Sequence, residues 1–278
     1  MLTSLDPGYR PPVKLRRASA LLSIILLTAG CSDDPTQHPV EDAGASGDGG
    51  VDDPTSHWHI GDGPLAPISG KAFLFGPTNG EMLVGAKVSV AEAPEHQTTV
   101  AADGTFAFEV PSGAPVSFVI EQAGFHPNQS ATLAIDPKGI EMLGFQVPTE
   151  STFDLLANFA DIEPDPTRCQ ITTTVSRAGT EPYGGSGLGE PDVVVTIDPP
   201  LPSESGPVYF EYVNESLILP LPSLTATSLD GGVIFANVPP GEYALTATKQ
   251  GKQFSTVAIR CRAGLLINAA PPHGLQEL

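Results

Sequence analysis

The three cysteines are the residues of this sequence whose chemistry is easiest to assign. Cys31 ends an apolar run near the N-terminus, whereas Cys169 and Cys261 lie in a part of the chain rich in strand-forming residues. If Cys31 is modified, an even pair remains, and in an oxidising compartment such a pair predicts a disulfide between Cys169 and Cys261. Two free, buried thiols are the alternative. No Cys-x-x-Cys is present and no histidine lies near Cys169 or Cys261 in sequence, which disfavours zinc binding and nucleophilic catalysis.

The six histidines do not form a hydrolase motif. His-Glu-x-x-His is absent, and the only His-x-x-Glu runs from His38 to Glu41 in a segment too polar to form a core. His57 and His59 flank the single tryptophan, Trp58, in the same segment, where alternate residues lack the fixed geometry of a metal site. We therefore predict no metal, no cofactor and no catalytic residue, and the sequence does not identify a ligand-binding residue.

Two further enzyme patterns are not completed. The stretch Gly184-Gly185-Ser186-Gly187-Leu188 has leucine where a nucleophile elbow needs its second glycine, so we interpret it as a flexible loop. Intradiol ring-cleaving dioxygenases use two tyrosines and two histidines on iron in a related sandwich. The C-terminal part of this chain has no histidine beside its tyrosines, which are Tyr183, Tyr209, Tyr212 and Tyr243. We expect these tyrosines to be half-buried, with their hydroxyls at the rim.

The N-terminus has the pattern of a secretory signal. Four basic residues precede the 13-residue apolar run 18–30, and they are Arg10, Lys14, Arg16 and Arg17. A basic flank followed by a short apolar run is typical of an exported and cleaved segment, and the run is too short to span a bilayer. A buried N-terminal helix is the alternative.

The residues around Cys31 refine this prediction. Leu27-Thr28-Ala29-Gly30-Cys31 resembles the lipobox of bacterial lipoproteins, although Thr28 stands where that family usually has an aliphatic residue. The resemblance implies that Cys31 is the lipidated N-terminus of the mature protein. Ser32 after the cysteine is similar to lipoproteins sorted to the outer membrane. Several acyl chains would be needed for stable attachment, because one saturated chain anchors only marginally.

Composition limits the possible partners and the fold class. The chain has 278 residues, 13 Lys and Arg against 32 Asp and Glu, and a net charge of −19. Loss of residues 1–30 removes four basic residues and one acidic residue, which makes the net charge −22. Such a chain has no basic footprint for nucleic acid. Its 29 Gly and 29 Pro favour turn-rich β structure.

The periodicity of the chain predicts two β-rich units after a polar segment. Residues 32–66 are dominated by Asp, Gly, Pro and Ser and are expected to be disordered. From Gly70 onward, short alternating apolar runs are separated by turn signals, as in a sandwich of two sheets. Between the units, Ser151 and Asp154 resemble a capping box at the start of a short helix that we expect to pack between the units.

Both β-rich units resemble one known family, the carboxypeptidase regulatory-like domain with a transthyretin-like, or prealbumin-like, β-sandwich. The first match is carried by Gly85-Ala86-x-Val88, Asp103-Gly104-x-Phe106-x-Phe108, Val110-Pro111-x-Gly113 and Gly124-Phe125. The second runs from Asp230-Gly231-Gly232 through Val238-Pro239-Pro240-Gly241 to Tyr243-x-Leu245. The resemblance implies an internal duplication and a fold without the catalytic zinc domain of the enzymes that carry such modules.

We therefore predict an all-β protein built from tandem transthyretin-like sandwiches. The expected parts are a signal peptide (1–30), a disordered acidic tether (31–66), a first sandwich (67–148), a helical linker (149–167), a second sandwich (168–272) and a tail (273–278). The predicted function is that of a non-catalytic, exported outer-membrane lipoprotein with an accessory, binding or structural role through protein contacts. A carbohydrate-binding module is the alternative, and a metal-dependent peptidase or dioxygenase is third. The expected partners are the membrane, through the lipid, and an envelope protein or glycan.

Overall fold

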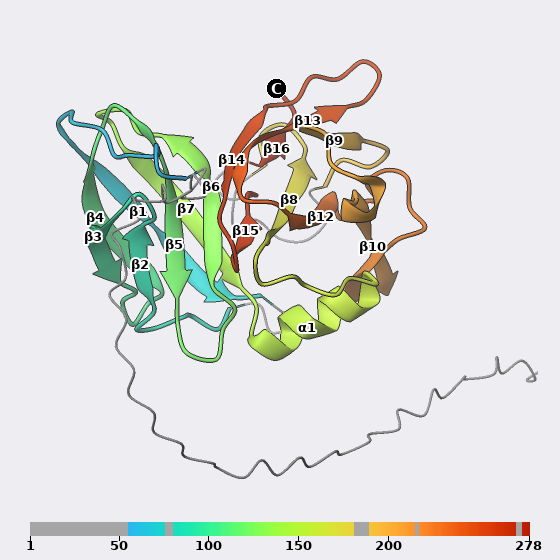
Figure 1. Cartoon of the computed structure of the whole chain (residues 1–278), viewed down its shortest axis with the longest axis horizontal. Coiled ribbons are helices and arrows are strands. Elements are labelled where there is room, and N and C mark those ends of the chain that lie inside the picture. Colours follow the sequence, from blue (N-terminus) through green and yellow to red (C-terminus); the bar gives the residue numbers. More distant parts are fainter. Residues whose placement is uncertain (1–54, 76–79, 181–188, 215–216, 271–273) are drawn as a thin grey trace, which may run out of the picture. The chain divides into compact units, whose positions relative to one another are not determined.

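Strands dominate the part of the chain that the structure describes, so the predicted all-β class is confirmed (Figure 1). The structure is a computed structural model that describes residues 55–75, 80–180, 189–214, 217–270 and 274–278. The predicted signal peptide, Cys31 and the predicted tether up to residue 54 lie outside these residues, as do Tyr183 and the glycine-rich stretch 184–188. The described residues belong to one compact unit, Val51–Leu278. None of its described helices is long and apolar enough to cross a bilayer.

The first half of this unit is a sandwich of two sheets. Its strands are β1 (Leu65–Leu74), β2 (Lys87–Val90), β3 (Ala93–Thr99), β4 (Thr105–Pro111), β5 (Pro115–Glu121), β6 (Asn128–Ala134) and β7 (Ile140–Val147). One sheet has the order β4-β1-β7, and the other contains β3-β2-β5-β6. Alternation places Val116, Phe118 and Ile120 on the inner face of β5, where all three are fully buried.

The second half repeats the connectivity of the first. Its elements are β8 (Cys169–Ser176), β9 (Val194–Asp198), the short 3-10 helix η1 (Ser203–Ser205), β10 (Val208–Asn214), β11 (Leu217–Leu221), β12 (Gly232–Val238), β13 (Gly241–Thr248), β14 (Val257–Cys261), β15 (Leu266–Asn268) and β16 (Leu275–Gln276). Strand β8 lies between antiparallel β12 and parallel β15, as β1 lies between antiparallel β4 and parallel β7. Strand β13 lies between β9 and β14, as β5 lies between β2 and β6.

The repeated sequence pattern occupies equivalent places in the two halves. Asp103-Gly104 precedes β4, and Asp230-Gly231 precedes the corresponding strand β12. Gly104 and Gly231 both have positive φ, at 80° and 76°, a backbone conformation that suits glycine because it has no Cβ. The motif therefore specifies the same turn and the same following strand in each half.

The two halves share a sheet. Strand β15 of the second half pairs in parallel with β6 of the first, where Leu266 pairs with Asn128 and Ile267 with Gln129. The strands consequently form one continuous path, β11-β10-β12-β8-β15-β6-β5-β2-β3 (Figure 1). Because this pairing covers an edge of each half, it joins them through backbone hydrogen bonds as well as side chains.

The disulfide between Cys169 and Cys261 is present. It connects the start of β8 to the end of β14, which belong to different sheets of the second half. Both cysteines are fully buried, and their Cα atoms are 5.8 Å apart. The bond therefore ties the two sheets together across the second hydrophobic core.

Helix α1 (Glu150–Phe159) begins earlier than its predicted cap. Thr149, with an extended backbone, is the N-cap, and its hydroxyl accepts a hydrogen bond from the Thr152 N–H at 3.1 Å. Ser151 instead lies inside the first turn, so the prediction of Ser151 as the cap was wrong. The helix contacts β11 of the second half, and Phe153 stacks on His126 of the first half with ring centroids 3.6 Å apart.

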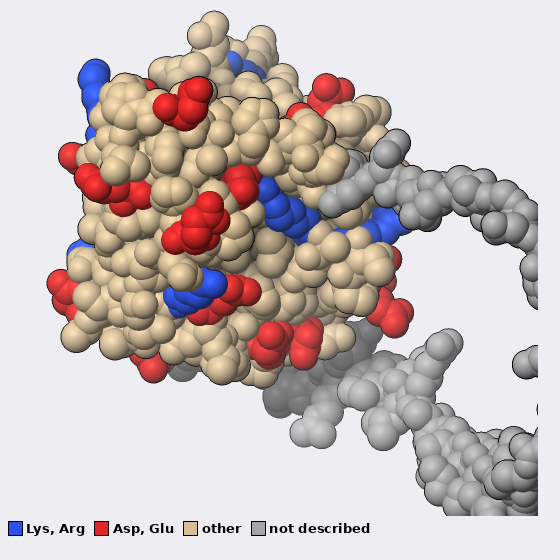
Figure 2. Space-filling view, turned by 60° about the vertical axis from the view of Figure 1, so that its left-hand side comes forward, with Lys and Arg blue, Asp and Glu red and all other residues tan. Residues whose placement is uncertain are grey.

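The expected boundary between tether and first sandwich was also wrong. Strand β1 begins at Leu65, inside the range assigned to the tether, and the preceding Trp58 is only 8 % exposed. A polar composition predicted disorder here, but Trp58, Ile60 and the hydrogen bond from the Gly63 N–H to the Ser112 carbonyl oxygen hold this segment against the rest of the protein. Figure 2 shows acidic side chains spread over one face with fewer basic ones, in line with the acidic composition.

Candidate functional site

Strand β6 carries an unusual set of buried polar side chains at the joint of the two halves. Asn128, Gln129 and Ser130 are at most 1 % exposed. A strand between two apolar layers would normally present apolar residues here, because a buried polar group needs a hydrogen-bond partner. Ser130 and Asn128 bind within the first half: the Phe118 N–H donates to the Ser130 hydroxyl at 3.0 Å, and the Asn128 amide donates to the Gln146 carbonyl oxygen at 3.4 Å. Gln129 instead binds residues of the second half.

The backbone of Arg260 in β14 is bound by side chains of β6. The Arg260 N–H donates to the hydroxyl of Thr132 at 2.9 Å, and the Gln129 amide donates to the Arg260 carbonyl oxygen at 2.7 Å. Strand β14 is an outer strand of the sheet β14-β13-β9. Polar side chains of the first half therefore cover this sheet edge and satisfy the backbone groups that it presents.

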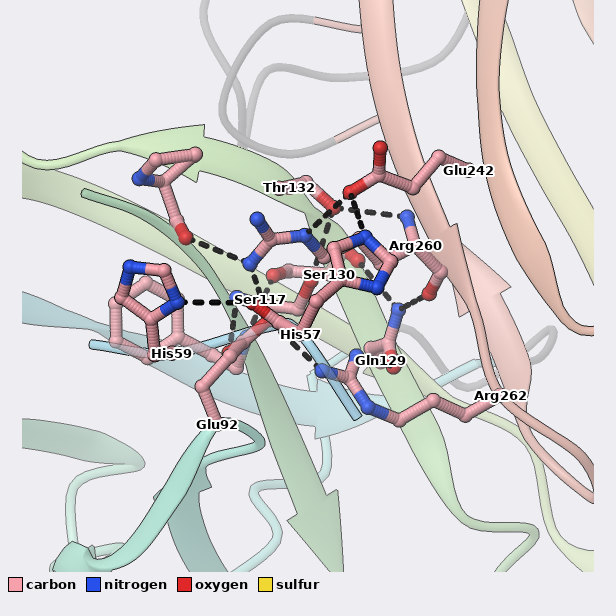
Figure 3. A network of polar contacts seen from close by, with 12 residues as sticks. His57, His59, Glu92, Ser117, Gln129, Ser130, Thr132, Glu242, Arg260 and Arg262 are labelled. Atoms are coloured by element: carbon pink, nitrogen blue, oxygen red, sulfur yellow. Dashed lines mark hydrogen bonds and ion pairs between the residues drawn. The ribbon is translucent and has the colours of Figure 1, made fainter. Parts of the chain in front are cut away.

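Glu92, between β2 and β3, is the centre of a charged cluster at the same joint. Its side chain is 0 % exposed. Oε1 accepts from Arg260 Nη1 at 2.9 Å and from Arg262 Nη2 at 2.8 Å, and Oε2 accepts from the Ser117 N–H at 2.9 Å (Figure 3). We call Glu92, Arg260, Arg262 and Gln129 the Glu92 cluster. One carboxylate of the first half thus binds two guanidinium groups of the second.

Each arginine of the Glu92 cluster has further acceptors. Arg260 donates from Nη1 to the Pro115 carbonyl oxygen at 2.8 Å and from Nε to Glu242 at 3.2 Å. Arg262 donates from Nη1 to the Gln129 side-chain oxygen at 2.9 Å. A buried ion pair is tolerated only when such hydrogen bonds offset the loss of hydration.

Trp58 lies against both arginines. The Cζ atoms of Arg260 and Arg262 are 5.4 and 4.7 Å from the centroid of its ring, within the range of cation–π attraction. The neighbouring His57 remains on the surface, with Nε2 3.9 Å from the exposed carboxylate of Glu242. His59 also stays exposed, and its Nδ1 lies 2.8 Å from the His57 carbonyl oxygen. The two histidines flank a structural tryptophan, and the described residues contain no group of three potential metal ligands.

A second buried carboxylate, Glu190, lies in another part of the second half. It is 4 % exposed and contacts Lys249, Lys252 and Arg177. Hydrogen bonds from Lys249 and Lys252 lower the pKa of Glu190 to about 2. Lys252 also binds Glu277 at 2.8 Å, next to β16, so this cluster holds the C-terminal residues against the turn between β13 and β14.

The tyrosines take structural positions. Tyr209 is 1 % exposed, and its hydroxyl accepts a hydrogen bond from the Val195 N–H at 3.1 Å, so the expectation of a half-buried ring was wrong for this residue. Tyr243 is partly buried and its hydroxyl donates to the Pro239 carbonyl oxygen at 3.0 Å. Each of these two hydroxyls has a backbone partner.

Sequence reasoning did not identify the Glu92 cluster. One signal was available: Arg260 and Arg262 flank Cys261, so the alternation of an extended chain points both arginines to the side opposite the buried cysteine. The carboxylate that they share comes from a turn 168 and 170 residues earlier, which no local pattern connects to them.

The Glu92 cluster holds the two halves together through hydrogen bonds and ion pairs. The carboxylate oxygens of Glu92 already accept three hydrogen bonds, two of them from groups with a permanent positive charge. Both carboxylate oxygens therefore bind protein atoms.

Comparison with known proteins gives little further information. No protein-family model matches the chain, and no curated protein matches it. Among solved structures, the Bacillus anthracis TIE protein has 13 % identity and a TM-score of 0.25, over 74 % of this chain and 33 % of that one. The chain thus spans about a third of the length of that protein.

Two pilins are also similar in part. The shaft pilin SpaA from Lactobacillus rhamnosus GG has 8 % identity and a TM-score of 0.24, over 77 % of this chain and 97 % of the pilin. The minor pilin of Streptococcus agalactiae has 8 % identity and a TM-score of 0.23, over 76 % and 95 %. These similarities are too low to support an argument about function.

Proposed function

We propose that this chain is a non-catalytic, lipid-anchored protein of the bacterial outer membrane, in which two carboxypeptidase regulatory-like sandwiches act as one rigid unit with a structural or protein-binding role. The lipid is attached to Cys31. The observation that carries the structural part of the proposal is the Glu92 cluster, because its charged groups are used to join the halves. The resemblance of residues 27–31 to a lipobox supports the anchor.

Rigidity follows from backbone and side-chain connections at the joint. The β6–β15 pairing joins backbones, Thr132 and Gln129 bind the backbone of Arg260, and Glu92 binds two arginines. Tandem domains linked only by a flexible segment would move independently. A unit whose parts keep a fixed relation is suited to hold a binding surface at a set position.

The assignment to the carboxypeptidase regulatory-like class is supported by the repeated connectivity and by the position of its motif. In both halves the Asp-Gly turn leads into a strand that pairs antiparallel with the first strand of that half. In the second half, the hydrogen bond from Tyr243 to Pro239 fixes the turn at Pro240 and Gly241. The duplication inferred from sequence thus has a counterpart in topology.

The buried position of Trp58 disfavours the glycan-binding alternative. Sugar-binding surfaces commonly display aromatic rings, and this is the only tryptophan of the chain. Because its ring is buried against Arg260 and Arg262, it is not presented to a ligand. We therefore retain protein contact as the proposed mode of binding.

Mass spectrometry of the mature N-terminus tests the anchor. We expect the membrane fraction to contain a chain that begins at Cys31 and carries acyl groups on that residue. Cys31→Ser is the matched variant, and it should lose both the lipid mass and the membrane association. An intact Met1, or a membrane-bound chain with an unmodified Cys31, would contradict the proposal. Metal-dependent turnover of peptides or catechols by the purified protein would contradict its non-catalytic part.

A further inference from the structure

The segment that leads into β1 lies along the first half of the protein. Residues 55–63, which we call the strap, end at Gly63, whose N–H donates to the Ser112 carbonyl oxygen at 2.9 Å. The N–H and hydroxyl of Ser112 donate to the Pro64 carbonyl oxygen at 3.0 and 2.9 Å. A Cβ at Gly61 would lie 2.1 Å from the Ser112 carbonyl oxygen, so the strap backbone is in close contact with the turn after β4.

The side chains of the strap reach both halves. Ile60 packs against the first hydrophobic core, whereas Trp58 packs on Arg260 and Arg262 of the second half. Those two arginines are the ones that bind Glu92. One ring therefore lies against the ion pairs that hold the halves together.

The free energy of docking the Trp58 ring has one favourable and one unfavourable contribution. Its ring attracts two guanidinium groups. Its indole Nε1–H, however, is buried without a hydrogen-bond partner among the described residues. A buried donor without a partner loses free energy that it regains on contact with water. The two contributions oppose each other, so docking of the ring is weaker than its burial suggests.

We propose that the strap is a releasable element: docked Trp58 covers the Glu92 cluster, and its release lets water reach the cluster and loosens the side-chain contacts between β6 and β14, while the β6–β15 pairing still connects the halves. Water weakens the ion pairs because it raises the local dielectric constant. With the lipid on Cys31, as proposed above, a pull on the anchor would reach the strap before any described strand. Release itself does not require lipidation, so the test below is independent of the anchor.

Fluorescence of the full-length mature protein in detergent gives the first test, because Trp58 is the only tryptophan. We expect weak acrylamide quenching in the wild type and a several-fold larger quenching constant in Arg262→Ala. Arg177→Ala is the matched control, since it removes an arginine of the same half that pairs with Glu190. Equal quenching in wild type and Arg262→Ala would overturn the proposal.

Amide hydrogen exchange gives the second test, on Trp58→Ala and Trp58→Phe. We expect Trp58→Ala to speed exchange in β6 and β14 by about tenfold, with less than about twofold change in β2 and β12. Trp58→Phe keeps a ring over the arginines and should remain close to wild type. Unchanged exchange in β6 and β14 would overturn the proposal. A uniform increase across all strands would also overturn it, because it would show a general loss of stability without local release.

Discussion

Glu92 and Arg262 are 170 residues apart in the chain, yet Nη2 of the arginine lies 2.8 Å from Oε1 of the glutamate. The contact joins a turn of the first half to the residue that follows β14 in the second. Because the side chain of Glu92 is 0 % exposed, its charge depends on this partner and on Arg260 for compensation.

Replacement of Glu92 by Gln should destabilise the protein strongly. Two guanidinium groups would lose their shared negative partner while remaining partly buried, and we expect the free energy of unfolding to fall by about 2 to 3 kcal/mol. Denaturant titration followed by circular dichroism measures this change. Glu95→Gln, an exposed acid in β3, should alter stability by less than about 0.5 kcal/mol. Equal effects of the two substitutions would contradict the role assigned to Glu92.

Removal of the disulfide should destabilise the second half. The bond closes a loop between residues that are 92 positions apart, for which the chain-entropy model gives about 4 to 5 kcal/mol. We expect the double variant Cys169→Ala, Cys261→Ala to lower the free energy of unfolding, measured by denaturant titration, by up to this amount. A thiol count under denaturing conditions without reductant provides the check on the wild type. Detection of both thiols as free would refute the bond.

Glu190 should contribute to stability only above acidic pH. Its folded pKa, about 2, lies below the ordinary value of 4.5, because Lys249 and Lys252 donate hydrogen bonds to the carboxylate. Because the pKa is lower in the folded state, the ionised carboxylate stabilises the fold at every pH above the pKa of the unfolded state. This stabilisation is lost as pH falls from about 4.5 toward 2. Unfolding free energies measured over this range should fall less steeply in Glu190→Gln than in the wild type. The exposed Glu141→Gln serves as control, and an unchanged slope in Glu190→Gln would exclude this account.

The equivalent turns before β4 and β12 should respond oppositely to loss of their aspartate charge. Burial, and secondarily Glu211, raises the pKa of Asp230, so its ionised form opposes folding at neutral pH. Hydrogen bonds from Thr105, by side chain and backbone, lower the pKa of Asp103, so its ionised form favours folding. The stabilisation from Asp103 is present above its unfolded pKa and is lost as pH falls, whereas Asp230 favours folding only at low pH.

At pH 7 we therefore expect Asp230→Asn to raise the melting temperature and Asp103→Asn to lower it. Asparagine keeps a side-chain oxygen and is also common in turns, so both variants keep the turn chemistry. Thermal melts at pH 7 and at pH 3 provide the measurement. The difference between each variant and the wild type should shrink at the lower pH. Shifts of the same sign in both variants at pH 7 would refute the opposite roles.

Several parts of the structure follow from local sequence. The all-β class, the two Asp-Gly turns and the repeated motif are short-range features, because turn residues and two-residue alternation act within a few positions. The pairing of Cys169 with Cys261 followed from counting cysteines in a chain that the sequence predicts to be exported. These predictions needed no knowledge of which strands meet.

The joint between the halves was decided only by the tertiary structure. Asn128, Gln129 and Ser130 have the composition of an exposed strand, and Trp58 stands in a segment with the composition of a linker. Gln129 and Trp58 contact Arg260 and Arg262, which are more than a hundred residues away in the chain. Which sheet edges meet is set by the packing of two complete halves, and neither hydrophobic period nor turn chemistry encodes a contact over that distance.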